Sequence, residues 1–294
     1  MRKHAFLIMA HKDDYTFYTL LKLLDDTRNT LFIHMDKKNK KYNPNSVYDV
    51  VHHSEVIHTH RRVNVNWGAY SQIEAELELL DTATQAGVFH YYHLISGEDL
   101  PIKSQDYIHN FFDINQGKEF VHYSKPVLNF PYRTSLYHTF QQYLNKNNRL
   151  SMLLNEKYIY IQQCLRVHRN KNISFHMGAN WFDISDEFAR YILTKRKWIQ
   201  KVFYHTVCCD EVFVQTILMN SDFKIRLNHP SSEDSYTAIM RRIDWERSDG
   251  NSPWTFCIGD AEELSDSPML FARKFNCKID RDIIDYVAEN LAIS

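Results

Sequence analysis

The chain of 294 residues is predicted to fold as an α/β protein, with a mostly parallel, twisted sheet flanked by helices. Three observations predict this class. Short apolar runs alternate with helix-like segments over residues 1–110, which is the rhythm of repeated βαβ units. A composition of 44% hydrophobic and 24% charged residues is that of a globular protein with a sizeable core. No apolar run approaches the roughly 20 residues that a membrane-spanning helix needs.

Four strands and two helices are predicted in the N-terminal part. The strands are the apolar runs at residues 5–10, 30–34, 56–58 and 91–95, and the helices cover residues 15–24 and 71–83. The second helix is the best defined, because Ile73, Leu77 and Leu80 recur at helical spacing. Ser71 and Glu74 have the spacing of a capping box, in which both side chains bind backbone N–H groups at the start of the helix.

The rest of the chain is less regular. A helix is expected after Ser104, and an irregular excursion over residues 120–160. We also expect helices near residues 150–164, 186–193 and 210–219, a strand-turn-strand over 174–184, and polar loops at 231–234 and 247–252. No repeat, low-complexity tract or linker is present, which predicts a single domain over residues 1–294.

Charge and cysteine content argue against several classes of protein. The net charge is -1, so we expect no nucleic-acid partner, which would need a concentrated basic surface. Five irregularly spaced cysteines fit neither a disulfide framework nor a metal site, and indicate reduced thiols in a cytoplasmic protein. Histidines at three-residue spacing fall on strand-like segments, where they point to opposite faces, so no metal site is expected.

The most informative junction is the fourth strand and the polar loop that follows it. Glu98 and Asp99 lie directly after this strand, and ligands of open α/β sheets bind beyond the carboxyl ends of the strands. We therefore expect both residues near an active site. Because neighbouring side chains at a strand end point apart, at least one of the two carboxylates is expected to have a structural role.

Two further residues could contact a nucleotide. Asp36 ends the second strand, where a carboxylate can accept hydrogen bonds from a ribose or a base. The alternative is a surface residue that begins a lysine-rich loop. Trp67 precedes the capped helix, and its indole could stack on a nucleobase or fill the core.

Charged residues in the C-terminal half complete the candidate site. Glu211 lies at a predicted helix start, where the dipole favours an ionised carboxylate, as a general base requires. Arg273 and Lys274 interrupt an apolar run, so they need a counter-anion or access to water. A diphosphate or a structural carboxylate would both serve.

Four ordered sequence blocks carry a resemblance to a known family. They are Phe32-Ile33-His34-Met35-Asp36, Trp67-Gly68-Ala69-Tyr70-Ser71, Leu94-Ile95-Ser96-Gly97-Glu98-Asp99-Leu100-Pro101 and Leu270-Phe271-Ala272-Arg273-Lys274-Phe275. With these blocks the chain resembles the core-2/I-branching β-1,6-N-acetylglucosaminyltransferases and peptide O-xylosyltransferases, glycosyltransferase family 14. The chain lacks the membrane anchor and the disulfide-forming cysteines of animal members, as a soluble bacterial member would.

The resemblance implies a GT-A type nucleotide-sugar-binding fold and inverting transfer from a UDP-sugar to a glycan hydroxyl. N-acetylglucosamine is the sugar expected, in β-linkage. Residues 1–110 would form the nucleotide-binding half, and residues 111–294 the acceptor and catalytic half. Family members lack the Asp-x-Asp metal motif, so no metal or other cofactor is expected, and the Asp280-Arg281-Asp282 of the C-terminal tail is treated as incidental.

The resemblance also implies roles for individual residues. Asp36 and Trp67 would contact uridine, Glu211 would be the base, Arg273 and Lys274 would meet the diphosphate, and Glu98, Asp99, Glu119 and Trp181 would lie at the acceptor or in the cleft. One position departs from the family, since Trp254 stands where a second basic residue is usual. Arg273 or Arg242 are the expected substitutes.

Two alternatives stay open. The donor sugar could be xylose, glucuronic acid or galactose, because a few pocket contacts decide it. The chain could also be a carbohydrate-binding protein that has lost catalysis, as its aromatic content allows. The sequence leaves open the acceptor, the oligomeric state and peripheral association with a membrane.

Overall fold

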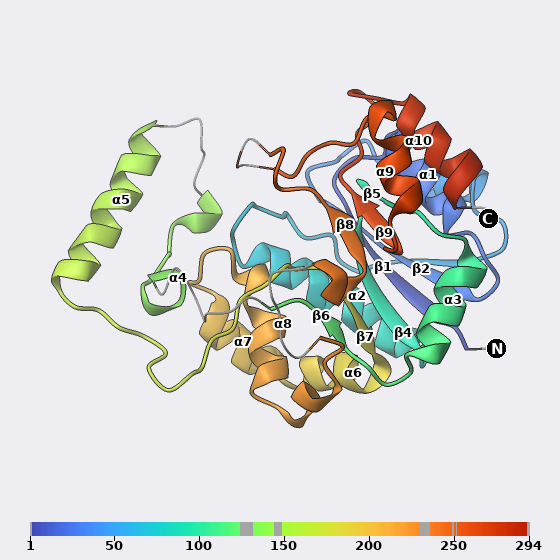
Figure 1. Ribbon diagram of the computed structural model, residues 1–294. Coiled ribbons are helices and arrows are strands. Elements are labelled where there is room, and N and C mark those ends of the chain that lie inside the picture. The colour runs from blue at the N-terminus through green and yellow to red at the C-terminus, as the bar shows by residue number, and fades with distance from the viewer. Residues whose placement is uncertain are drawn as a thin grey trace.

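The computed structural model describes residues 2–123, 132–143, 149–229, 236–248, 250 and 252–292. Its centre is a six-stranded sheet in the order β3-β2-β1-β4-β7-β6 (Figure 1). The strands are β1 (His4–Ala10), β2 (Asn29–Met35), β3 (Glu55–His58), β4 (Tyr91–Ser96), β6 (Phe120–Val121) and β7 (Phe182–Ser185). The first four are parallel, and β7 is antiparallel to both β4 and β6. The predicted α/β class, with a mostly parallel sheet, is confirmed, and the architecture is consistent with a GT-A type fold.

The strand order creates a crevice beside β1. The chain runs from β1 to β2 and β3 on one side, and then returns to place β4 on the other side. Ligands of open α/β sheets bind at such a reversal, outside the carboxyl ends of the strands. There the Gly97 N–H donates to the Met9 carbonyl at 2.9 Å, which closes the loop after β4 against the end of β1.

A second, three-stranded sheet brings the C-terminal segment to this edge. It consists of β5 (Asp99–Pro101), β9 (Phe271–Arg273) and β8 (Arg241–Ile243), in that order. Strand β9 is antiparallel to β5, and Asp99 is paired with Arg273 in register. Two of the sequence blocks that were far apart in the chain are therefore neighbours.

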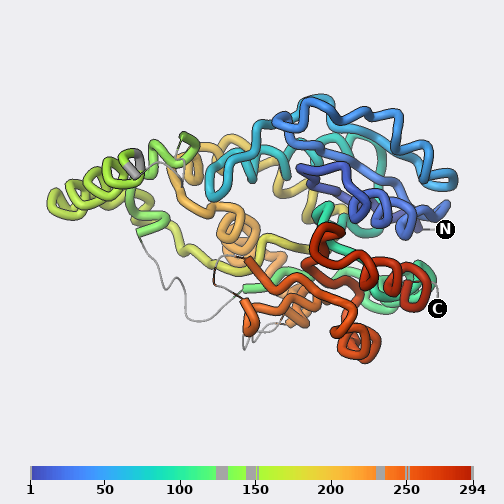
Figure 2. Tube along the Cα trace, turned by 90° about the horizontal axis from the view of Figure 1, so that it is seen from above, coloured from blue at the N-terminus to red at the C-terminus, as the bar shows by residue number. Residues whose placement is uncertain are grey.

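Helices cover both faces of the large sheet, except that α5 (Arg149–Cys164) projects from the body of the molecule (Figures 1 and 2). The helices are α1 (Tyr15–Leu23), α2 (Ser71–Ala86), α3 (Gln105–Ile114), α4 (Tyr132–Ser135), α5, α6 (Asp186–Thr194), α7 (Arg196–Phe203), α8 (Phe213–Met219), α9 (Ala261–Asp266) and α10 (Asp282–Tyr286). The predicted helices at 15–24, 71–83, 150–164 and 186–193 are confirmed. No helix of the described residues is long and apolar enough to cross a membrane.

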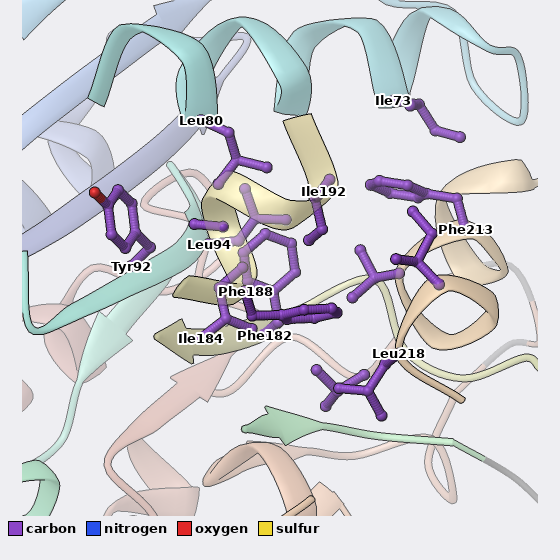
Figure 3. Packing of buried hydrophobic residues seen from close by; sticks show 14 of the residues in the cluster. Ile73, Leu80, Tyr92, Leu94, Phe182, Ile184, Phe188, Ile192, Phe213 and Leu218 are labelled. Carbon is purple, nitrogen blue, oxygen red and sulfur yellow. The ribbon is translucent and has the colours of Figure 1, made fainter. Parts of the chain in front are cut away.

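Two apolar layers pack against opposite faces of the sheet. Because strand side chains alternate, Leu7 of β1 joins the layer under α2 and α6, whereas Phe6 and Ile8 join the layer under α1, α3 and α10. Figure 3 shows part of the first layer, in which Leu80 of α2 lies over Phe188 of α6. All these side chains are buried, so both faces of the sheet are covered by closely packed apolar side chains.

A buried ion pair links the two sheets. The Arg241 guanidinium of β8 donates to both carboxylate oxygens of Asp183 in β7, at 2.8 and 2.9 Å, and also to the Leu94 carbonyl of β4 at 2.9 Å. Asp183 Oδ1 also accepts from the ring of His93 at 2.8 Å. Such a bidentate pair fixes orientation as well as distance, and here it fixes β8 against β7, while the bond to Leu94 connects β8 to β4.

Two local predictions are wrong. The Ser71 Oγ accepts from the Asn66 N–H instead of capping its own helix, and Tyr70 occupies the cap position, so there is no capping box. Residues 174–181 are not a strand, and only β7 forms there. The helix expected over residues 210–219 is confirmed as α8, which begins at Phe213 after a 3-10 turn, Cys209–Glu211. The predicted loop at 231–234 lies outside the described residues.

Candidate active site

A cleft of about 620 Å³ lies at the carboxyl edge of the sheet. The ends of β1, β2 and β4 form one side of it, and the turn before α8 and the end of β9 form the other. It gathers all but two of the predicted site residues: Asp36, Trp67, Glu98, Trp181, Glu211, Arg273 and Lys274. The structure thus brings together side chains that are spread over most of the sequence.

Asp36 and Trp67 lie on the side of the cleft formed by the N-terminal half. The Asp36 carboxylate is almost buried, and it accepts from the Lys38 N–H at 2.8 Å while it faces the cleft. It is not a solvated surface residue, contrary to the simpler interpretation. Trp67 is 61% exposed, so its indole does not fill the core and lies open at the cleft instead.

The Trp67 loop is connected to the turn that carries Glu211. The Cys208 N–H donates to the Gly68 carbonyl at 2.8 Å, and Gly68 has a φ of +68°, which favours glycine. Gln72 strengthens the connection, because its carboxamide accepts from the Gly68 N–H at 2.5 Å and donates to Asp210 at 2.7 Å. The Trp67 loop and the turn that carries Glu211 are therefore one hydrogen-bonded unit.

The two carboxylates after β4 have separate roles. Glu98 faces the cleft between two cations, with Oε1 2.9 Å from Lys12 Nζ and Oε2 3.3 Å from Lys274 Nζ. Burial alone would raise the pKa of Glu98, but the hydrogen bond from Lys12 and the charge of Lys274 outweigh it and lower that pKa. The carboxylate is therefore ionised and aligns Lys274.

The predicted position of Asp99 is wrong, because this residue does not line the cleft. Its side chain is 1% exposed and accepts from the Ser96 N–H at 2.9 Å and the Ser96 Oγ at 2.8 Å. Its Oδ1 also lies 3.5 Å from Arg273 Nη1. The fold uses Asp99 to shape the loop after β4 and to hold Arg273 from behind.

Arg273 and Lys274 present positive charge to the cleft from the end of β9. The Arg273 guanidinium lies 4.3 Å from the centroid of the Trp181 ring, a cation–π arrangement that the pairing with Asp99 reinforces. Lys274 reaches Glu98, and its Nζ also donates to Ser252 Oγ at 3.3 Å. Two cations and a supporting aromatic ring form an anion-binding wall.

Glu211 lines the same cleft from the 3-10 turn before α8. Its Oε2 is 2.8 Å from Arg133 Nη1, and its carbonyl accepts from the Gly178 N–H at 2.8 Å. A Cβ on Gly178 would lie 1.9 Å from the His122 carbonyl oxygen, so only glycine fits in this tightly packed segment. Glu211 is half-exposed, as a group that must meet a substrate should be.

Two buried carboxyl groups lie behind Glu211. Burial, and then the charge of Glu211, raise the pKa of Asp210 to about 7. Burial also raises the pKa of Glu76 well above its usual range, and both of its carboxyl oxygens lack a hydrogen-bond partner among the described residues. Asp210 and Glu211 both line the cleft, and Glu211 is the one whose carboxylate pairs with Arg133.

The predicted position of Glu119 is wrong as well. It was expected at the acceptor, but it is fully buried, and its carboxyl accepts from the Ser185 N–H at 2.9 Å and from the Ser185 Oγ at 2.5 Å. Burial raises its pKa to about 7, although the bonds from Ser185 act in the opposite direction. Glu119 stabilises the end of β7 and cannot contact an acceptor in this arrangement.

The structure also places the residues considered for the second basic position. Trp254 donates to Asp260 at 3.0 Å beneath the Arg247 guanidinium, away from the cleft. Arg242 forms an ion pair with Glu263 at 2.7 Å and does not line the cleft. Of the two expected substitutes, Arg273 lines the cleft.

Some residues that contact the carboxylates of the cleft were not assigned a role from the sequence. Lys12 and Gln72 hold Glu98 and Asp210, and Arg133 pairs with Glu211. Lys12 had a positional signal, because it follows the first strand at the same edge of the sheet. Arg133 belongs to an aromatic stretch of the sequence, residues 130–143, that is suited either to line an acceptor site or to fill a core. Gln72 had no signal, since its partner is distant in the chain. Within the described ranges, no three His, Cys, Asp or Glu side chains are grouped to hold a metal ion.

Comparison with known proteins gives two matches over most of the chain. The family model of the core-2/I-branching enzymes matches residues 4–266. A human protein described as N-acetyllactosaminide β-1,6-N-acetylglucosaminyl-transferase is 23% identical over 285 residues, which cover 92% of this chain and 67% of that protein. The match therefore includes every segment that lines the cleft up to Pro253.

Proposed function

The chain belongs to the core-2/I-branching enzyme family of glycosyltransferases, and on that premise we propose that it transfers N-acetylglucosamine from a UDP-sugar to a glycan hydroxyl. The observation that carries this proposal is the cleft itself, in which Glu211 and Lys274 lie together with Asp36 and Trp67. The name of the human relative, an N-acetylglucosaminyl-transferase, supports this choice of sugar.

The donor would bind along the side of the cleft that the N-terminal half forms. Asp36 offers a carboxylate oxygen to the uridine, and the open indole of Trp67 offers a stacking surface. The diphosphate would lie against Arg273 and Lys274, where Glu98 and Asp99 already hold both cations in place. Such preorganised charge stabilises a leaving group without reorganisation during the reaction.

The transfer step would be a single displacement with inversion, which gives a β-linked product. Glu211 would take the proton from the acceptor hydroxyl while the hydroxyl oxygen attacks the anomeric carbon of the donor. The bond from that carbon to the diphosphate breaks, and UDP leaves with the electron pair. Lys274 and Arg273 would neutralise the charge that develops on UDP, so the proposal includes no metal.

A donor panel tests the proposal. The purified chain would be incubated with UDP-N-acetylglucosamine, UDP-xylose, UDP-glucuronic acid or UDP-galactose and a mixture of glycan acceptors, and UDP release would be measured. We expect the greatest release with UDP-N-acetylglucosamine. Preference for another donor would change the sugar and keep the mechanism. No release with any donor would contradict the proposal and favour a carbohydrate-binding protein without catalysis.

A further inference from the structure

A second cavity of about 400 Å³ lies between α5 and the Trp67 loop. Residues of α4 and α5 line it on one side, and Trp67 and Cys208 on the other. Trp67 lines the active-site cleft as well. Arg133, which lines the second cavity, forms an ion pair with Glu211, which lines the cleft. The two spaces therefore meet at the candidate base.

The second cavity has side chains suited to a neutral, hydroxyl-rich ligand. Three aromatic rings border it, from Trp67, Tyr132 and Tyr160, and Tyr160 is 66% exposed. Sugar rings present C–H groups that pack on aromatic faces, and their hydroxyls need donors and acceptors. Asn155 and Glu156 supply these groups, and the Asn155 Oδ1 has no hydrogen-bond partner among the described residues.

Helix α5 has two distinct sides. Asn155, Glu156 and Tyr160 border the cavity, whereas Ile161 and Leu165 are outside it and exposed. In two views the helix projects from the body of the molecule (Figures 1 and 2), so it extends the surface on which a long ligand could lie. The active-site cleft alone lacks this extension.

We infer that the cavity under α5 is a glycan-binding subsite for sugar units beyond the one that receives the transferred sugar. With its accepting hydroxyl beside Glu211, the rest of the glycan would pass Arg133 and Trp67 and stack on Tyr160. That this glycan is an acceptor rests on the proposed function. That the cavity binds a glycan rests on its lining alone.

Binding to a microarray of defined glycans, with titration of each glycan that binds, tests the inference. The informative variant is Tyr160→Ala, and the control is Ile161→Ala, the neighbouring residue on the other side of α5. We expect Tyr160→Ala to weaken binding by about fivefold or more, which is the effect of losing one aromatic face. Asn155→Ala is a second variant on the cavity side, and circular dichroism verifies folding.

Each outcome decides the inference. A loss with Tyr160→Ala and Asn155→Ala but not with Ile161→Ala supports the subsite. Equal binding by all three variants, or no binding of any glycan by the unmodified chain, overturns it. The proposed function is judged separately by UDP release. Glycan binding that depends on Tyr160 without UDP release from any donor would keep the subsite and reject the transferase proposal.

Discussion

Arg133 Nη1 lies 2.8 Å from Glu211 Oε2, and this ion pair stands where the cleft and the second cavity meet. The arginine is largely buried, and although burial lowers the pKa of a guanidinium, the charge of Glu211 raises that of Arg133 above its usual range. The carboxylate therefore has a fixed direction and a permanent cation beside it. A general base in this position is oriented before the acceptor binds.

The first prediction concerns the base. Glu211→Gln keeps the shape of the side chain but cannot take a proton, so transfer should fall by about 10²–10⁴-fold while UDP affinity stays the same. Steady-state kinetics and calorimetric titration with UDP would measure the two effects. The exposed Glu246→Gln is the matched control, and unchanged activity of Glu211→Gln would remove this residue from the mechanism.

The second prediction concerns the partner of the base. Arg133→Ala removes a charge-assisted hydrogen bond, so kcat/KM should fall by roughly 10–100-fold. Arg133→Lys keeps the charge but loses the planar fork, and should recover only part of the activity. Full activity of Arg133→Ala would show that Glu211 needs no partner, and full activity of Arg133→Lys would show that charge without the planar fork is sufficient.

The third prediction concerns the anion-binding wall. Lys274→Ala removes one of the cations that face the cleft. It also removes one of the two positive partners of Glu98, whose negative charge would then repel the diphosphate, so the Kd for UDP should rise by about tenfold or more. Lys278→Ala, a change of an exposed lysine in the same segment, should leave the Kd unchanged. Equal affinities of the two variants would place the diphosphate elsewhere.

The fourth prediction concerns metals. Because Arg273 and Lys274 would supply the positive charge, dialysis against EDTA should leave the rate of UDP release within twofold of its value before treatment. The measurement needs a parallel sample with added manganese. A rate that is lost in EDTA and restored by manganese would refute the metal-independent proposal.

The fifth prediction concerns stability against pH. Burial raises the pKa of Glu119 from 4.5 to about 7 on folding, so its contribution to stability is full below the unfolded value and is lost as pH rises through the folded value. Glu119→Gln removes this dependence. Between about pH 5 and pH 8, the unfolding free energy of the variant should rise by roughly 2–3 kcal/mol relative to the unmodified protein.

Denaturant unfolding of both proteins across this pH range checks the fifth prediction. Only the difference between them isolates Glu119, because buried histidines such as His34 and His109, whose pKa values burial lowers to about 4, have the opposite dependence. A difference that stays constant with pH would show that Glu119 is already ionised in the folded protein.

The sheet was predictable because its signal is local. Apolar runs and helical spacing are properties of neighbouring residues, so the first four strands and the long helices followed from the sequence within a few residues. A prediction fails where a group has more than one possible hydrogen-bond partner, because the sequence does not show which partner it binds. Ser71 had the sequence of a cap, but the Asn66 N–H bound its hydroxyl instead.

The sequence by itself determined the α/β class, the family resemblance and the residues that could carry the chemistry. Only the tertiary structure decided which of them share a cleft. Glu98 and Asp99 are adjacent in sequence, yet β5 pairs with β9 so that Asp99 is buried behind Arg273, whereas Glu98 faces Lys274. Burial and distance between remote segments set the role of a carboxylate, and neither is a property of its neighbours in the chain.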